Sequence, residues 1–416
     1  LIKIGGNLNQ QHWGGETALI AAASHGHVDA LQTLIAAKAD LHSRDRDGNG
    51  ALHRAATKGF VEILDVLIKA GVDLNQHHWG GETALFAVAR VGNAHAVDVL
   101  IAAKANVNLV NNDRNSPLLA AVSAGSIACM QALLKAGADI NQRCWGGRTA
   151  IAAAAHEGRV DCVEFLMHAK AEINTADDTG RSPLCFAASQ GHASTVQLLC
   201  EAKANLEIHD AFGTSALSAA AYYGHADVLR LLIDAKANFR IRERDGRTAL
   251  VIAAEQGHVD AVNVLLRAGC PVDECDDHGN TPFLSAVRWN RSECAAAVLA
   301  AGANIDVCNK RGLDAVMIVA MDQYGRHGPL TDVLIDAKAD VNSRNTHGKT
   351  PLMLAAYHGN VGMIRKLLSA NADPNVVDEC GNTALLLAAR VGSSAIVGLL
   401  LAANADASAV DGRGVS

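Results

Sequence analysis

A short string of the form Gly-x-Thr-Ala/Pro-Leu recurs through this chain at an almost constant interval. With the residue at the threonine position taken as an anchor, every interval is 33 residues, except one of 36 residues between Asp314 and Thr350. The residue after the anchor is always alanine or proline, and the next is Leu, Ile, Val or Phe. Such a period predicts stacked repeats rather than independent globular domains. The anchors are Thr17, Gly50, Thr83, Ser116, Thr149, Ser182, Ser215, Thr248, Thr281, Asp314, Thr350 and Thr383.

The residues after each anchor predict two short helices and a polar loop. The anchor hydroxyl is typical of a helix N-cap, and the proline that often follows it fits the first helical position. In the unit anchored at Thr248, apolar residues recur at helical spacing on both sides of Gly257, and Gly269 ends the second helix in a left-handed turn. Helices of about eight to ten residues are marginal alone. Each unit must therefore stack on its neighbours, which predicts an all-α solenoid.

The repeating unit resembles the ankyrin repeat. The segments that carry the resemblance include GETALIAAASHGHVDALQTLI (15–35), GRTALVIAAEQGHVDAVNVLLRAG (246–269) and GKTPLMLAAYHGNVGMIRKLL (348–368). The resemblance covers essentially the whole chain, and it implies helix–turn–helix–hairpin units that stack into a curved superhelix. We expect one continuous array over residues 1–416 with a partial repeat at each end, as in a fragment of a longer ankyrin-repeat protein.

Two departures from the pattern are visible. The repeat at 312–346 carries three extra residues within 321–333, which predicts a longer loop between its helices. The loop is either a tolerated surface insertion or a hinge or contact loop. Lysine also replaces the glycine or asparagine expected after the second helix. A left-handed residue with a β-carbon costs on the order of 1 kcal/mol, so we expect these turns to be strained or differently closed. The lysines are Lys38, Lys104, Lys170, Lys203, Lys236 and Lys338.

Charge and hydropathy exclude several classes of function. A net charge of −7 argues against general nucleic-acid binding. The chain has no uncharged apolar run of about 18 residues, which argues against direct membrane insertion. A phosphate-binding loop, a nucleophile elbow and a zinc-protease helix are all absent from the sequence, so we predict no enzyme activity and no cofactor.

Histidines and cysteines are numerous, but their positions favour structural roles. Four histidines follow the glycine between the two helices, which is the Gly-His turn of the ankyrin repeat, so we predict no metal site. The ten cysteines include no CxxC pair, and stacked helices lie too far apart for an unstrained disulfide. We expect free thiols in an intracellular, reducing compartment, with the cytoplasm as the predicted location. The histidines are His27, His192, His225 and His258.

The aromatic residues predict where a partner binds. The ankyrin resemblance implies docking on the concave face, formed by the hairpin tips and the end of each first helix. This surface, called here the hairpin face, comprises offsets −4, −3, −1, +7 and +8 from each anchor. An even spread would place about two of the 15 aromatic residues on it, whereas eight lie there. They are Trp13, Trp79, Trp145, Phe212, Tyr222, Tyr223, Trp289 and Tyr357.

Tryptophan and tyrosine are typical anchors of protein interfaces, so we predict a non-catalytic scaffold that binds one or more proteins. The Trp-Gly-Gly strings recur every 66 residues, and the alternative is that each folds back on its own loop. Two other functions stay open: a regulatory or tethering segment of a larger enzyme or channel, and a structural subunit of a large assembly. The arginines predicted to form the polar rim are Arg90, Arg148, Arg181, Arg244, Arg247 and Arg288.

Overall fold

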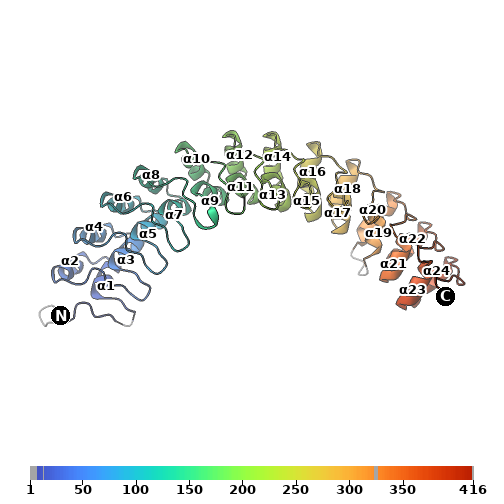
Figure 1. Cartoon of the computed structure of the whole chain (residues 1–416), viewed down its shortest axis with the longest axis horizontal. Helices are drawn as coiled ribbons and strands as arrows, with labels where there is room; N and C mark the ends of the chain where they lie inside the picture. Colours follow the sequence, from blue (N-terminus) through green and yellow to red (C-terminus); the bar gives the residue numbers. More distant parts are fainter. Residues whose placement is uncertain (1–6, 13, 323–326, 415–416) are drawn as a thin grey trace. The chain divides into compact units, whose positions relative to one another are not determined.

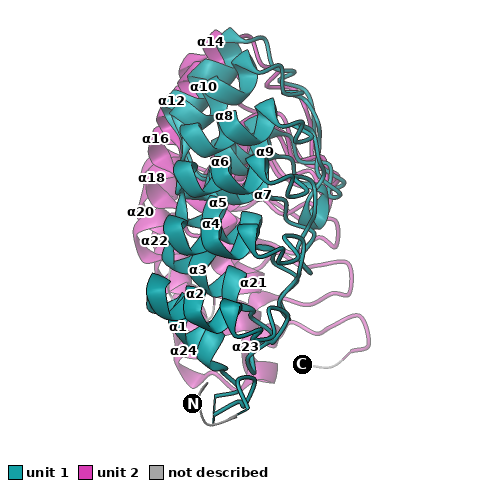
Figure 2. Ribbon diagram, turned by 90° about the vertical axis from the view of Figure 1, so that its left-hand side faces the viewer, with its two compact units in different colours: residues 1–211 teal, residues 212–416 magenta. Residues whose placement is uncertain are grey.

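The computed structural model describes residues 7–12, 14–322 and 327–414. These residues form 24 α-helices in consecutive pairs, and no β-strand occurs among them, which confirms the predicted all-α fold. The chain divides into two compact units, residues 1–211 and residues 212–416 (Figure 2). Each unit contains six helix pairs. That the repeats form one continuous array across residue 211 stays a prediction.

Unit 1 holds the helices of the first six anchors. They are α1 (Ala18–Ser24), α2 (Val28–Ala36), α3 (Ala51–Lys58), α4 (Val61–Lys69), α5 (Ala84–Val91), α6 (Ala94–Ala102), α7 (Pro117–Ala124), α8 (Ile127–Lys135), α9 (Ala150–His156), α10 (Val160–His168), α11 (Pro183–Ser189) and α12 (Ala193–Glu201). A short 3-10 helix, η2 (Trp145–Gly147), occupies one hairpin tip.

Unit 2 holds the helices of the other six anchors. They are α13 (Ala216–Tyr223), α14 (Ala226–Asp234), α15 (Ala249–Gln256), α16 (Val259–Arg267), α17 (Pro282–Arg288), α18 (Ser292–Ala300), α19 (Ala315–Ala320), α20 (Gly328–Asp336), α21 (Pro351–His358), α22 (Val361–Ser369), α23 (Ala384–Val391) and α24 (Ser394–Ala402).

Within each unit, the first helices of successive repeats form one row and the second helices form another (Figure 1). The core lies between the two rows. In α3, Ala55 and Ala56 are fully buried, and Leu64 of α4 is fully buried opposite them. Alanine in the first helix lets neighbouring helices approach closely, so these layers need few aromatic side chains. Only a few aromatic side chains, among them Phe186 and Phe283, lie in this core.

Helix starts follow the predicted capping. In ten of the twelve repeats, the anchor side chain accepts a hydrogen bond from the N–H three residues later, as Thr83 does from Phe86 at 3.3 Å. Asp314 caps its helix as well as a hydroxyl does, since its carboxylate accepts from the Met317 N–H at 2.8 Å. Gly50 has no side chain to cap with, and the Thr149 hydroxyl makes no hydrogen bond to any described residue.

The turns that follow the second helices are left-handed at the lysine positions, as at glycine. Every lysine that replaces glycine after a second helix has a left-handed backbone, with φ from 58° at Lys203 to 72° at Lys104. The turn closes in the same way as at glycine: the Lys104 N–H donates to the Ile101 carbonyl at 2.9 Å. The lysine turns are therefore strained rather than differently closed.

The enlarged repeat departs from the others where its two helices are joined. Its first helix, α19, is shortened to six residues, and α20 begins at Gly328. Residues 323–326 of the predicted loop lie outside the described residues. Beside them, an oxygen of the buried Asp322 lies 3.0 Å from the His327 backbone nitrogen, which donates to it, and 2.9 Å from Nδ1 of that ring.

Candidate functional site

The hairpin tips are linked from one repeat to the next by backbone hydrogen bonds. In most repeats, the N–H at offset −4 donates to the carbonyl at offset −3 of the preceding repeat. Examples are Asn112 to Gly80 at 3.0 Å in unit 1 and Arg244 to Phe212 at 2.8 Å in unit 2. The tip of Trp145 is instead linked to the following repeat, where the Asp178 N–H donates to the Gly146 carbonyl at 2.9 Å. The side chain at offset −4 then extends from a tip whose backbone is fixed, which suits a residue that must bind a partner with little loss of entropy.

In several repeats, a buried aspartate or asparagine at offset −5 accepts hydrogen bonds from backbone N–H groups of its own tip. In the second repeat, Asp45 Oδ1 accepts from the N–H groups of Asp47 at 3.0 Å and Asn49 at 2.8 Å. Burial acts to raise the pKa of Asp45, but the hydrogen bonds from Asn49 and Arg54 outweigh it and hold that pKa below its usual value.

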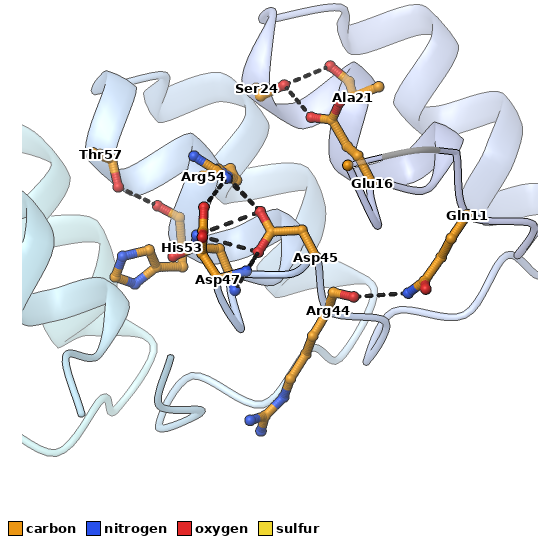
Figure 3. Close-up of polar contacts among 12 residues, drawn as sticks. Gln11, Glu16, Ala21, Ser24, Arg44, Asp45, Asp47, His53, Arg54 and Thr57 are labelled. Carbon is orange, nitrogen blue, oxygen red and sulfur yellow. Dashed lines mark hydrogen bonds and ion pairs between the residues drawn. The ribbon is translucent and has the colours of Figure 1, made fainter. Parts of the chain in front are cut away.

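Unit 1 contains a polar hollow of about 470 Å³ that includes residues of the first two repeats. Figure 3 shows Arg54 from α3 pointing at both carboxylates of the hairpin before it. Its Nε donates to Asp45 at 2.8 Å, and a terminal nitrogen donates to Asp47 at 3.3 Å. On the opposite side, the Ser24 hydroxyl donates to Glu16 at 3.1 Å. Arg54 and the two carboxylates satisfy one another, so these three charges are not available to a ligand.

The predicted aromatic anchors are exposed. Trp13 lies outside the described residues, and the other seven expose large fractions of their surface. Because water covers nearly half or more of each ring, none of them fills the core. The exposed fractions are 70% for Trp79, 70% for Trp145, 66% for Phe212, 45% for Tyr222, 54% for Tyr223, 52% for Trp289 and 55% for Tyr357.

Several of these exposed rings contact a neighbouring residue on one side. The Trp79 indole lies against the preceding tip, where Gly48 has a left-handed backbone and no room for a Cβ beside the ring. Trp79 thus packs on the neighbouring repeat instead of folding back on its own loop. In unit 2, Tyr222 and Tyr223 meet edge to face at the end of α13, with ring centroids 5.0 Å apart.

The six predicted rim arginines differ in how much of their charge is free. Arg247 is the most neutralised, since its guanidinium nitrogens lie 3.0 Å from Glu243, 2.8 Å from Asp245 and 3.2 Å from Glu255. Arg288 lines a smaller hollow of about 250 Å³ next to the enlarged repeat. The remaining contacts are Arg90 to Glu82 at 3.5 Å, Arg181 to Asp177 at 3.5 Å, Arg148 over the Phe186 ring at 4.5 Å, and the backbone bond of Arg244 given above.

Sequence reasoning missed a pairing rule on this face. Offsets −1 and +7 meet within one repeat, because the end of the first helix lies over the hairpin. Arg247 pairs with Glu255, and Glu82 pairs with Arg90 in the reverse order. Opposite charges eight residues apart across the helix were the available signal, but the helical period alone does not place them together.

Three side chains of unit 1 form a cluster of metal-ligating types. The ligand atoms of His53, His78 and Glu82 lie within 4.8 Å of one another, and the His53 Nδ1 is buried without a hydrogen-bond partner among the described residues. However, His78 Nδ1 accepts the Gly80 N–H at 2.6 Å, so the proton of a neutral ring sits on Nε2, 3.4 Å from Glu82. With no free lone pair on His78 and Arg90 beside Glu82, the donor set does not fit a metal ion.

The His78 position explains this arrangement. It is the offset −5 acceptor of its hairpin, the role that Asp45 has one repeat earlier. His53 occupies a slot that is apolar in neighbouring repeats, where Ile20 and Phe86 are buried. Burial, followed by the charges of His78 and Arg54, lowers the pKa of His53 to about 3. Both histidines therefore serve the fold.

The Gly-His turns and the cysteines also have structural roles. The ring of His192 bonds the His156 carbonyl at 3.0 Å, and that of His258 bonds the Tyr222 carbonyl at 2.9 Å, each in the preceding repeat. All ten cysteines are free thiols, and six of them are buried. Burial raises the pKa of Cys185 to about 12, which keeps this thiol protonated and unsuited to nucleophilic chemistry.

Comparisons with known proteins agree with the helix pairs. No curated protein matches the chain. Among solved structures, the crystal structure of the human ASB11 ankyrin repeat domain is similar, with 28% sequence identity and a TM-score of 0.49 over 54% of this chain and 99% of that one. None of the described helices has the length and apolar character needed to cross a membrane. The family model described as ankyrin repeats (3 copies) matches residues 1–78, 74–144, 151–243, 217–311 and 316–411, and the chain therefore belongs to the ankyrin-repeat family.

Proposed function

We propose that this chain is a non-catalytic scaffold that binds a partner protein through its hairpin face. Ankyrin repeats are generally modules of protein–protein interaction. The observation that carries the proposal is that seven aromatic side chains on this face expose between 45% and 70% of their surface. Large exposed apolar side chains on one surface are typical of interaction sites.

The size of the effect supports tryptophan as the main anchor. Covering the exposed part of one indole removes on the order of 150 Å² from water, which is worth about 4 kcal/mol before the costs of association. Trp79 and Trp145 each have 70% of their surface available. A backbone hydrogen bond links the Trp79 tip to the preceding repeat, and another links the Trp145 tip to the following one. Little conformational entropy of these tips is therefore lost on binding.

The free thiols support a reducing compartment as the place of action. We propose no activity or cofactor for the chain itself. The thiol with the most strongly raised pKa, Cys185, is buried, and the cluster of His53, His78 and Glu82 is satisfied by hydrogen bonds and charges of the fold.

The test is capture of a partner from an extract of the source, followed by mass spectrometry. The variants Trp79→Ala and Trp145→Ala should each retain less partner than the parent chain. Leu401→Ala is the matched control, because Leu401 is 44% exposed on α24, away from the hairpin face. If Leu401→Ala lost as much partner as the tryptophan variants, the hairpin face would not be the binding surface.

A further inference from the structure

The Arg148 guanidinium is a half-buried charge without a counterion. It lies over the ring of Phe186, with 4.5 Å from its central carbon to the ring centroid. No residue in the described part of the chain accepts a hydrogen bond from it or forms an ion pair with it. A guanidinium that has lost part of its water and gained no acceptor is costly unless a ligand supplies one.

A second cation faces the same ring. The Arg181 guanidinium carbon lies 4.6 Å from the Phe186 centroid. Its carboxylate partner is Asp177 at 3.5 Å, which also accepts from the Thr179 and Arg181 N–H groups at 2.9 Å. Asp177 thus pairs with Arg181 and with the hairpin N–H groups, and its carboxylate forms no ion pair with Arg148. Burial, and then the charge of Arg181, lowers the pKa of Arg148.

One other repeat of this chain, that of Arg247, fills the equivalent position with a carboxylate. Arg247 at offset −1 is paired by Glu255 at +7, 3.2 Å away. In the repeat of Arg148 the +7 residue is His156, whose pKa is lowered by burial and then by Arg148. The next acid, Glu157, is paired with Arg159 at 2.6 Å. The repeat of Arg148 therefore keeps the cation of the pair and lacks the carboxylate.

We infer that Arg148 and Arg181 form a subsite that receives a carboxylate side chain of the partner protein. The inference rests on the proposed function and names the chemistry that the partner must bring. A carboxylate is favoured because it is the group that occupies the same slot beside Arg247. Trp145, 70% exposed at the tip of the same repeat, adds an apolar contact, so the partner segment carries an acidic residue next to an apolar one.

The test uses a fluorescein-labelled hexaglutamate peptide, with hexaglutamine as the control peptide, in anisotropy titrations of the full chain. The chain has a net charge of −7, so hexaglutamate binds only where a local positive site outweighs that repulsion. Arg148→Gln should weaken its binding roughly tenfold or more, the usual range for a lost charged hydrogen bond.

His156→Glu provides a sharper variant, because it leaves both arginines in place. It supplies the missing carboxylate from within the chain, as Glu255 does for Arg247, and should weaken hexaglutamate binding about as much as Arg148→Gln. His156→Gln is the matched control and should bind like the parent chain. Thermal unfolding shows whether each variant is folded.

The outcomes separate the subsite from the wider proposal. Equal binding of hexaglutamate and hexaglutamine, or unchanged binding by both Arg148→Gln and His156→Glu, overturns the subsite. Displacement of the peptide by inorganic phosphate at concentrations where acetate has no effect overturns the choice of a carboxylate. Partner capture that depends on Trp79 but not on Arg148 overturns the subsite while leaving the hairpin face as the binding surface.

Discussion

The Trp79 indole lies against Gly48 of the preceding repeat, whose left-handed backbone leaves no room for a Cβ beside the ring. The ring still exposes 70% of its surface. One edge of the indole is therefore positioned by a neighbouring hairpin while the rest faces water. This is the condition of a side chain that is ordered before its partner arrives.

Tryptophan fluorescence tests this exposure. Because Trp79, Trp145 and Trp289 expose half or more of their surface, emission should be red-shifted and readily quenched by acrylamide. Trp79→Ala and Trp145→Ala should each change the free energy of unfolding by less than about 1 kcal/mol, since neither ring fills a core. A large loss of stability in either variant would mean that the rings are structural.

Helix capping predicts different changes in helix stability for substitutions at three anchors. Thr83→Ala should destabilise α5 by about 1 kcal/mol, because its hydroxyl caps the Phe86 N–H. Thr149→Ala should cost less, because that hydroxyl makes no cap bond. Gly50→Thr should stabilise α3 by about 0.5–1 kcal/mol, with only a shift of the flexible Gln76 amide to accommodate it. Hydrogen exchange of the helix amides measures all three, and equal effects at Thr83 and Thr149 would contradict the capping geometry.

The left-handed lysines predict that a lysine-to-glycine substitution in these turns stabilises the protein. Lys170 has φ of 69°, so Lys170→Gly should stabilise α10 by about 0.5–1 kcal/mol, after the entropy that glycine adds to the unfolded chain. Gly269→Lys should cost a similar amount, because a Cβ there meets no other atom and only the backbone conformation is penalised. Urea unfolding of both variants checks this. If Gly269→Lys left the free energy of unfolding unchanged, the left-handed lysine turns would not be strained.

Acid should destabilise unit 1, because His53 is protonated more readily in the unfolded chain than in the folded one. Its pKa is about 3 when folded and 6.5 when unfolded, so between those values the unfolded chain binds the extra proton. The free energy of unfolding should then fall on the order of 2 kcal/mol between pH 6.5 and pH 5. His53→Ile, which copies the apolar residue of this slot in the first repeat, should reduce that fall. His42→Ala at an exposed histidine is the control, and a parallel fall in all three proteins would show that His53 is not responsible.

The sequence predicts the helix pairs because its signals are local. An anchor hydroxyl caps its own helix, and Lys104 meets a left-handed turn because the preceding helix ends there. The exposed aromatics follow from the same register, since they lie at offsets −4, −3, +7 and +8, at a hairpin tip or at the end of a first helix. The family resemblance extends these local signals to the whole chain.

The charge pattern of the hairpin face was harder to predict, because it depends on which side chains meet across the hairpin and between repeats. Arg247 was expected to offer a charge to a partner, yet Glu243, Asp245 and Glu255 surround it. Arg148 carries the same offset and has no such partner among the described residues. The difference lies at offsets −5, −3 and +7, which hold three acids beside Arg247 and Cys144, Gly146 and His156 beside Arg148. Its meaning appears only when the hairpin and helix are seen together.

Comparative capture by chains with altered hairpin faces tests the central claim most directly. Three baits are compared: the parent chain, the tryptophan variant that combines Trp79→Ala with Trp145→Ala, and Leu401→Ala. Mass spectrometry quantifies the partner that each bait retains at equal amounts of folded protein. The account predicts that the tryptophan variant loses most of its partner while Leu401→Ala retains it. Full retention by the tryptophan variant, with unfolding unchanged, would contradict binding through the hairpin face.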